Sequence, residues 1–176
     1  MNEFEQALLA SVEEYSKGYL QAVKDLRELV RKANESVKKV TDSEVSLTMS
    51  TVESGDGEEA FVLNAEMIQR PVYGSNHRTR SNTNFLRAFE FPGTGYPAKM
   101  FSDYEDWQNS YQNEDRIAII GSKVQLSQAI DALAKDRGSP LMRMISYSLR
   151  SKESRQNRFE QTPKPERDEG NGDIPF

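Results

Sequence analysis

The first forty residues carry the longest regular pattern in the sequence, and this pattern constrains the fold more than any other feature. Apolar and aromatic residues recur there at alternating steps of four and three: Leu8, Val12, Tyr15, Tyr19, Ala22, Leu26, Leu29 and Ala33. This spacing places them on one face of an α-helix, so we expect a single long helix over residues 1–40. Two interpretations stay open: the helix covers its own sheet, or it also pairs with a second helix in a homo-oligomer.

The middle of the chain alternates between apolar and polar residues, as half-buried strands do. Turn-forming residues occur between the expected strands, at 54–57 and at 92–95. On the third strand we expect Phe85, Arg87, Phe89 and Phe91 to share one face, and the aromatic residues to be core. The polar stretch 71–84 is expected to be an exposed connection. The four strands are expected at residues 45–51, 61–67, 85–91 and 96–101.

Short helices are expected after residue 101. Ser102 to Glu105 forms a capping box before a helix containing Trp107, Ser122 caps a second helix, and Ser139-Pro140 starts a third. The brief apolar run 117–120 is either a fifth strand or a loop. Residues 1–150 are thus predicted to be one α+β domain with a long N-terminal helix, a four-stranded antiparallel sheet and short C-terminal helices. In the second and third of these short helices, the residues expected to face the core are Val124, Leu126, Ile130, Leu133, Leu141, Met144, Ile145 and Leu149.

The composition changes after Arg150. From Ser151 to Asp173 the only large apolar residue is Phe159, and three prolines follow Thr162. A segment of this kind cannot offset its ordering entropy by burial, so residues 151–176 are predicted to be a disordered tail.

Composition excludes several classes of protein. The chain has no cysteine, which removes disulfides, thiolate metal sites and cysteine catalysis. No apolar run is long enough to span a membrane, and the acidic N-terminal residues lack the pattern of a signal peptide. We expect a soluble, cytoplasmic protein.

The net charge of −5 conceals two basic blocks. Residues 70–101 hold five Lys or Arg against one Glu, and residues 136–158 hold six against two acidic residues. Aromatic residues lie within both blocks, and basic tracks with aromatic rings are what single-stranded DNA requires. The alternative is a solvated face that balances the acidic residues. The candidate nucleic-acid contacts are Arg70, Tyr73, Arg78, Arg80, Arg87, Arg143, Arg150, Lys152 and Arg155.

The last four residues, Asp173, Ile174, Pro175 and Phe176, have no structural use in a polar tail unless another protein buries them. They resemble the C-terminal tip of bacterial single-stranded DNA-binding proteins, which recruits helicases, nucleases and recombination mediators. The resemblance implies that these four residues dock on such proteins. One difference is Gly170-Asn171-Gly172, which stands where that family has consecutive aspartates. The N-terminal helix differs as well, because that family begins with a strand of an oligonucleotide-binding barrel.

The leading hypothesis is therefore a non-enzymatic protein that binds single-stranded DNA and recruits partners in replication, recombination or repair. The alternative is an interaction protein that occupies the docking pocket for this tip without touching DNA. No catalytic residues, metal ligands or cofactors are predicted. His77 is the only histidine and has no partner in the pattern, and the acidic residues at 103–106 are explained by helix capping.

Overall fold

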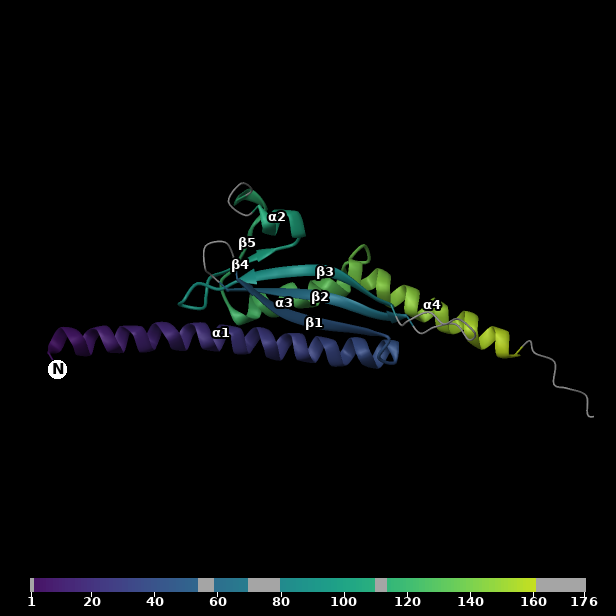
Figure 1. Ribbon diagram of the computed structural model, residues 1–176, viewed down its shortest axis with the longest axis horizontal. Helices are drawn as coiled ribbons and strands as arrows, with labels where there is room; N and C mark the ends of the chain where they lie inside the picture. Colours follow the sequence, from purple (N-terminus) through teal and green to yellow (C-terminus); the bar gives the residue numbers. More distant parts are fainter. Residues whose placement is uncertain (1, 54–58, 70–79, 110–113, 161–176) are drawn as a thin grey trace, which may run out of the picture.

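The computed structural model describes residues 2–53, 59–69, 80–109 and 114–160, and it has the α+β class expected from the sequence. A long helix lies along one side of an antiparallel sheet, and the remaining helices come after β4 in the chain (Figure 1). The elements are α1 (Glu3–Thr41), β1 (Val45–Glu53), β2 (Glu59–Gln69), β3 (Arg80–Glu90), β4 (Ala98–Phe101), α2 (Tyr104–Gln108), a 3₁₀ turn (Glu114–Arg116), β5 (Ala118–Ile120), α3 (Lys123–Lys135) and α4 (Pro140–Glu160).

The sheet contains the expected four strands and a fifth. Its order is β1-β2-β3-β4-β5, so every strand pairs with its neighbour in the chain. In the first hairpin Val45 lies opposite Met67 and Glu53 lies opposite Glu59. The run Ala118–Ile120 adds β5 beside β4, which corrects the expectation of four strands.

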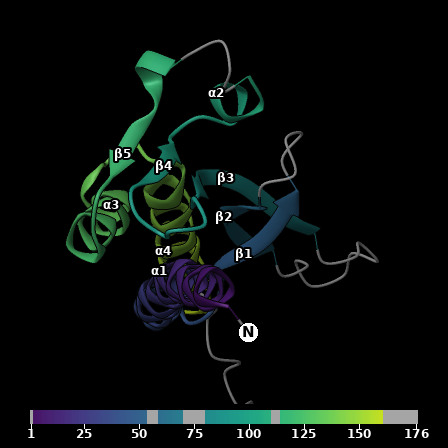
Figure 2. The same cartoon turned by 90° about the vertical axis from the view of Figure 1, so that its left-hand side faces the viewer.

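Helices cover the two faces of the sheet unequally. One face carries the main core, where Leu26 of α1, Leu126 of α3 and Leu141 of α4 meet sheet residues such as Leu63 and Phe89. In the described part of the chain, the other face carries a smaller cluster near β4, where Trp107 of α2 packs with Ala60, Val62, Ala88 and Phe101. Figure 2 shows α2 apart from the other three helices. The strand alternation places apolar side chains on both faces there.

A β-bulge in β3 corrects the expected face of the third strand. Leu63 lies opposite Arg87, but the next residue, Asn64, lies opposite Phe85, so Leu86 is an extra residue. Phe89 therefore faces the main core, whereas Phe85 packs on the other side, edge-to-face with Tyr104. Phe85 and Phe89 do not share a face. The core role of Phe89 and Phe91 is confirmed, since both are buried.

Three details of the helices differ from the expectations. The cap of α2 is Asp103 and not Ser102, because the Asp103 carboxylate accepts a hydrogen bond from the Glu105 N–H at 2.7 Å. Val124 and Leu149 are exposed and do not face the core. The third difference is at the end of α4, which continues to Glu160, so that the first ten residues of the expected tail are helical. Ser122 caps α3, as predicted.

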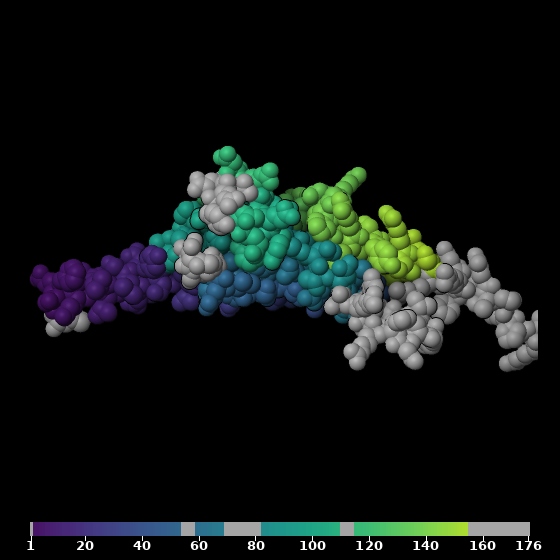
Figure 3. All heavy atoms as spheres, turned by 45° about the horizontal axis from the view of Figure 1, so that its top comes forward, coloured from purple at the N-terminus to yellow at the C-terminus, as the bar shows by residue number. Residues whose placement is uncertain are grey.

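Helix α1 extends well beyond the rest of the molecule. Every residue from Asn2 to Lys17 is exposed, and burial begins at Gly18. This part of α1, residues 3–17, is called the overhang below, and it projects as an arm in Figure 3. Asn2 caps it in a reciprocal hydrogen-bonded box with Glu5.

Polar side-chain contacts help to attach the rest of α1 to the sheet and to the turn before β4. The Tyr19 hydroxyl donates to Glu59 at 2.6 Å, and the Asn34 side chain accepts the Leu47 N–H of the edge strand β1 at 2.8 Å. The Tyr96 hydroxyl is 3.5 Å from Asp25. Burial, followed by the nearby carboxylate, raises the pKa of both Tyr19 and Tyr96 to about 12, so both hydroxyls remain donors at neutral pH.

Candidate nucleic-acid interface

The first basic block lies largely outside the described residues. Arg70, Tyr73 and Arg78 fall there, and His77 with them. Arg80 begins β3 opposite Gln69, at the end of the sheet where the β2–β3 connection lies. These residues remain candidates through their sequence alone.

Among the candidate DNA contacts in this block, Arg87 is the one whose side chain is described, and its side chain is engaged by the fold. Its Nη1 donates to the Leu86 carbonyl at 2.7 Å and lies 3.5 Å from the Ser102 carbonyl. Its Nε is buried and has no hydrogen-bond partner in the described part of the chain. Burial lowers the pKa of the guanidinium, which nevertheless stays charged at neutral pH. Arg87 therefore presents little of its charge to a phosphate backbone.

The second basic block forms an exposed stripe on α4. Arg143, Tyr147 and Arg150 are exposed, and their spacing of four and three places them on one face of the helix. Neither arginine forms an ion pair with any described residue. We call these three residues the α4 stripe. Arg155 and Arg158 continue the same helix, and their side chains lie outside the described part.

The opposite face of α4 fixes the orientation of the stripe. Leu141 and Met144 are buried in the main core, and the Ser148 hydroxyl donates to the buried Glu44 carboxylate at 2.7 Å. Lys152 forms an ion pair with Asp42, at the end of α1, at 2.6 Å. These contacts hold one side of the helix against the body, so the stripe faces solvent. Lys152, predicted as a DNA contact, is instead engaged with Asp42.

Among the described residues, exposed aromatic side chains occur on both sides of the sheet, and Tyr147 is the one that lies between two exposed arginines of its own helix. Tyr104 is half exposed and stacks edge-to-face on Phe85 and Trp107. The Trp107 Nε1–H donates to the buried Glu90 carboxylate at 3.2 Å. This aromatic cluster lies on the face of the sheet opposite α4. A single strand that follows the α4 stripe therefore has Tyr147 as its stacking surface.

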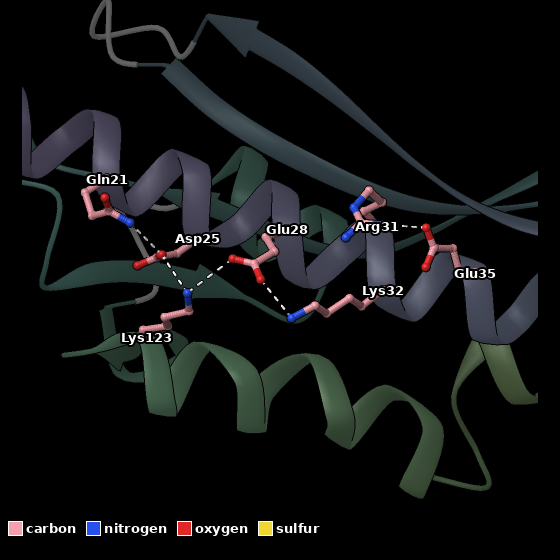
Figure 4. A network of polar contacts seen from close by, with 7 residues as sticks. All are labelled: Gln21, Asp25, Glu28, Arg31, Lys32, Glu35 and Lys123. Atoms are coloured by element: carbon pink, nitrogen blue, oxygen red, sulfur yellow. Dashed lines mark hydrogen bonds and ion pairs between the residues drawn. The ribbon is translucent and has the colours of Figure 1, made fainter.

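A polar network between α1 and α3 is the other dense cluster of charged side chains. Lys123 Nζ lies 3.0 Å from Asp25 and 3.3 Å from Glu28, and Gln21 donates to Asp25 at 2.8 Å (Figure 4). The hydrogen bond to Asp25, followed by that to Glu28, raises the pKa of Lys123. Because the ammonium stays protonated, it acts as a bridge between the helices and not as a base.

Neither a metal site nor a membrane span is evident where the structure can be read. Among residues 2–53, 59–69, 80–109 and 114–160 there is no cluster of three metal-ligating side chains. No helix within those ranges is long and apolar enough to cross a bilayer. The docking residues Asp173, Ile174, Pro175 and Phe176 lie outside them.

The sequence predicted the basic residues as one group of DNA contacts. It did not reveal which of them are exposed and which are engaged by the fold. The signal for the α4 stripe was present, because Arg143, Tyr147 and Arg150 have helical spacing beside a proline-started helix. The burial of Arg87 depends on the bulge at Leu86, which has no glycine or proline to mark it. Comparison with protein-family models, with curated proteins and with solved structures gave no match to this chain.

Proposed function

We propose that this protein binds single-stranded DNA along the α4 stripe and recruits DNA-processing proteins through Asp173–Phe176. The observation that carries the first half is that Arg143, Tyr147 and Arg150 are exposed together and that neither arginine forms an ion pair with a described carboxylate. The second half rests on the resemblance of the four residues to the tip of bacterial single-stranded DNA-binding proteins.

The geometry of the stripe favours a single strand over a duplex. The two arginines are separated by seven residues, which is about 10 Å along the helix axis. Tyr147 projects between them, where a base can stack on its ring. Bases in a duplex are already stacked and offer only their edges, so the tyrosine ring contributes little there. The contacts carry no hydrogen-bond readout, and binding is expected to be independent of sequence.

Reversing the charges of the stripe is expected to weaken DNA binding by about 30-fold. The change is Arg143→Glu with Arg150→Glu, and the measurement is fluorescence anisotropy of a labelled poly-dT oligonucleotide at two salt concentrations. The dependence of log K on log[salt] should also become shallower by about two, because two phosphate contacts are lost. Tyr147→Ala should weaken binding while leaving the salt dependence unchanged.

The matched control is Lys24→Glu with Lys39→Glu, which makes the same charge change on the exposed side of α1. Its DNA affinity should stay within about threefold of the unmodified protein, since long-range effects are screened. Equal losses in both double variants would mean that net charge, and not the stripe, drives binding. No binding at low salt would overturn the proposal for α4 and leave the docking hypothesis alone.

The docking residues are tested separately by competition. A fluorescent peptide with the tip sequence is bound to a bacterial helicase or nuclease that recognises it, and this protein is added as competitor. We expect displacement, weakened by about tenfold or more in Phe176→Ala because the ring is the apolar anchor. Phe159→Ala is the matched control and should compete normally. Recruitment through these residues would be contradicted if Phe176→Ala and Phe159→Ala displaced the peptide equally well, or if the unmodified protein did not displace it.

A further inference from the structure

The apolar stripe of α1 does not stop where the body of the protein stops. Within the body it is formed by Tyr19, Ala22 and Leu26, which pack against the sheet. The same heptad positions continue through Tyr15, Val12 and Leu8, and Phe4 lies close to the same face. In the overhang these four side chains are 53–74% exposed. No described residue covers the stripe before Tyr15.

Exposing an apolar stripe of this kind to water is unfavourable for a helix that has no tertiary contacts. The overhang has about four helical turns, and a helix of that length without tertiary contacts is marginal in water. Glu13 and Lys17, which pair with each other at 2.9 Å, lie off the stripe. Glu5 occupies the next heptad position before Leu8, where its carboxylate accepts the Asn2 N–H in the capping box. Exposed apolar rows rimmed by polar residues mark interaction surfaces.

The base of the overhang contains a hollow. Helix α1 and the turn before β4 meet there through glycines: a Cβ on Gly18 would lie 2.2 Å from the Thr94 carbonyl oxygen, and one on Gly93 would overlap the Tyr15 ring. Beside this contact lies an open cavity of about 440 Å³, lined by Ser11, Glu14, Tyr15, Gly18 and Thr94. The lining residues that belong to α1 lie along the same edge of the stripe as Phe4, because the helical period brings them to that side of the helix.

We propose that the overhang pairs antiparallel with the overhang of a second copy of this chain. An antiparallel pair with Leu8 opposite Val12 of the other copy is centred near residue 10. Phe4 of one copy then lies opposite residue 16 of the other, next to Glu14, Tyr15 and Gly18, which line the hollow. The surface is therefore self-complementary, as a twofold interface requires.

The position of the body excludes the parallel alternative. From Gly18 onward, the face of α1 that carries the stripe is covered by the chain's own sheet. A parallel partner would bring its own sheet to the same side at the same height, where the two bodies would overlap. In the antiparallel pair, each overhang occupies the space beyond the end of the other copy's sheet. Two helices overlapping over about 22 Å make an interface at the small end of the specific range, so we expect micromolar affinity.

Cysteine cross-linking tests the pairing and its direction, and the chain has no native cysteine to interfere. Leu8→Cys and Val12→Cys variants, one carrying a fusion that changes its size, are mixed and oxidised. The mixed disulfide is expected to form at least about tenfold faster than either homodisulfide. Ala10→Cys, on the opposite side of the helix, is the control. Fast homodisulfides in both single variants would indicate a parallel pair, and rates equal to the control would overturn the proposal.

Sedimentation equilibrium tests the role of Phe4. Phe4→Ala should weaken self-association by about tenfold or more, since each dimer loses two rings. Leu20→Ala is the matched control, because Leu20 is 64% exposed but lies away from the stripe. Circular dichroism checks that both variants keep their helix content. A monomer at tens of micromolar would overturn the dimer, and an unchanged constant for Phe4→Ala would overturn the assignment of Phe4 to the hollow. The dimer should persist when salt rises, whereas DNA binding should weaken.

Discussion

Replacing Gly95 by alanine is expected to lower the free energy of unfolding by about 3–4 kcal/mol, because two costs coincide at this position. Gly95 has φ +90, a conformation that alanine adopts only with strain. A Cβ there would also lie 2.2 Å from the carbonyl oxygen of Gly18. That oxygen belongs to the backbone of α1, which cannot move without withdrawing Ala22 and Leu26 from the core.

Chemical denaturation of the variant and the unmodified protein measures this effect through the denaturant midpoint. Gly121→Ala is the matched control, since the nearest atom to its Cβ is the end of the flexible Gln125 side chain at 3.2 Å. The control should change stability by less than about 1 kcal/mol. A Gly95→Ala protein as stable as this control would mean that the contact between α1 and the turn is not rigid.

Replacing Lys123 by methionine is expected to destabilise the protein, seen as a lower denaturant midpoint of unfolding. Asp25 is a buried carboxylate, and Lys123 is the cation that lies within 3.0 Å of it. Breaking a buried pair by removing one partner leaves the other charge uncompensated. The expected loss is at the lower end for such pairs, because Lys123 is half exposed and Gln21 still donates to Asp25.

The double variant Asp25→Leu with Lys123→Met distinguishes the cost of leaving Asp25 unpaired from the net contribution of the ion pair. If the cost of Lys123→Met is that of an unpaired charge, removing Asp25 as well should restore most of the stability. The raised pKa of Lys123 means that the bridge contributes below pH 10.5 and is lost as the pH rises through the higher folded value. The difference between Lys123→Met and the unmodified protein should therefore be constant from neutral pH to about pH 10 and shrink above it. A double variant less stable than Lys123→Met would contradict this account.

The sequence predicted the elements well where one local pattern decides them. The heptad over residues 1–40 gave α1 within a few residues, and Ser122 and Pro140 marked the starts of α3 and α4. It failed where pairing or burial depends on distant residues. The face of Phe85 is set by the bulge at Leu86, and Val124 is exposed because it sits on the outer side of α3.

The candidate interface was predictable in part for the same reason. The helical spacing of Arg143, Tyr147 and Arg150 is a local pattern, and the structure places all three on one exposed face. The engagement of Lys152 with Asp42 could not be foreseen, because the two residues are 110 positions apart in the chain. The half-burial of Arg87 likewise follows from a strand register that the sequence does not reveal. Charge counts identify a basic block, but tertiary contacts decide which of its members reach solvent.

The simple order of the sheet has a consequence for synthesis of the chain. Because β1 to β4 pair only with their sequence neighbours, a nascent chain that ends near residue 101 already contains every partner needed for three of the four strand pairs. It lacks α3 and α4, which carry Leu126, Leu133 and Leu141 onto the apolar face of the sheet. The sheet can therefore assemble during translation while that face is covered by α1 alone. A premature stop before residue 123 would release an intermediate whose strands are paired but whose sheet exposes apolar side chains. Such an intermediate is expected to be bound by chaperones and degraded by quality-control proteases.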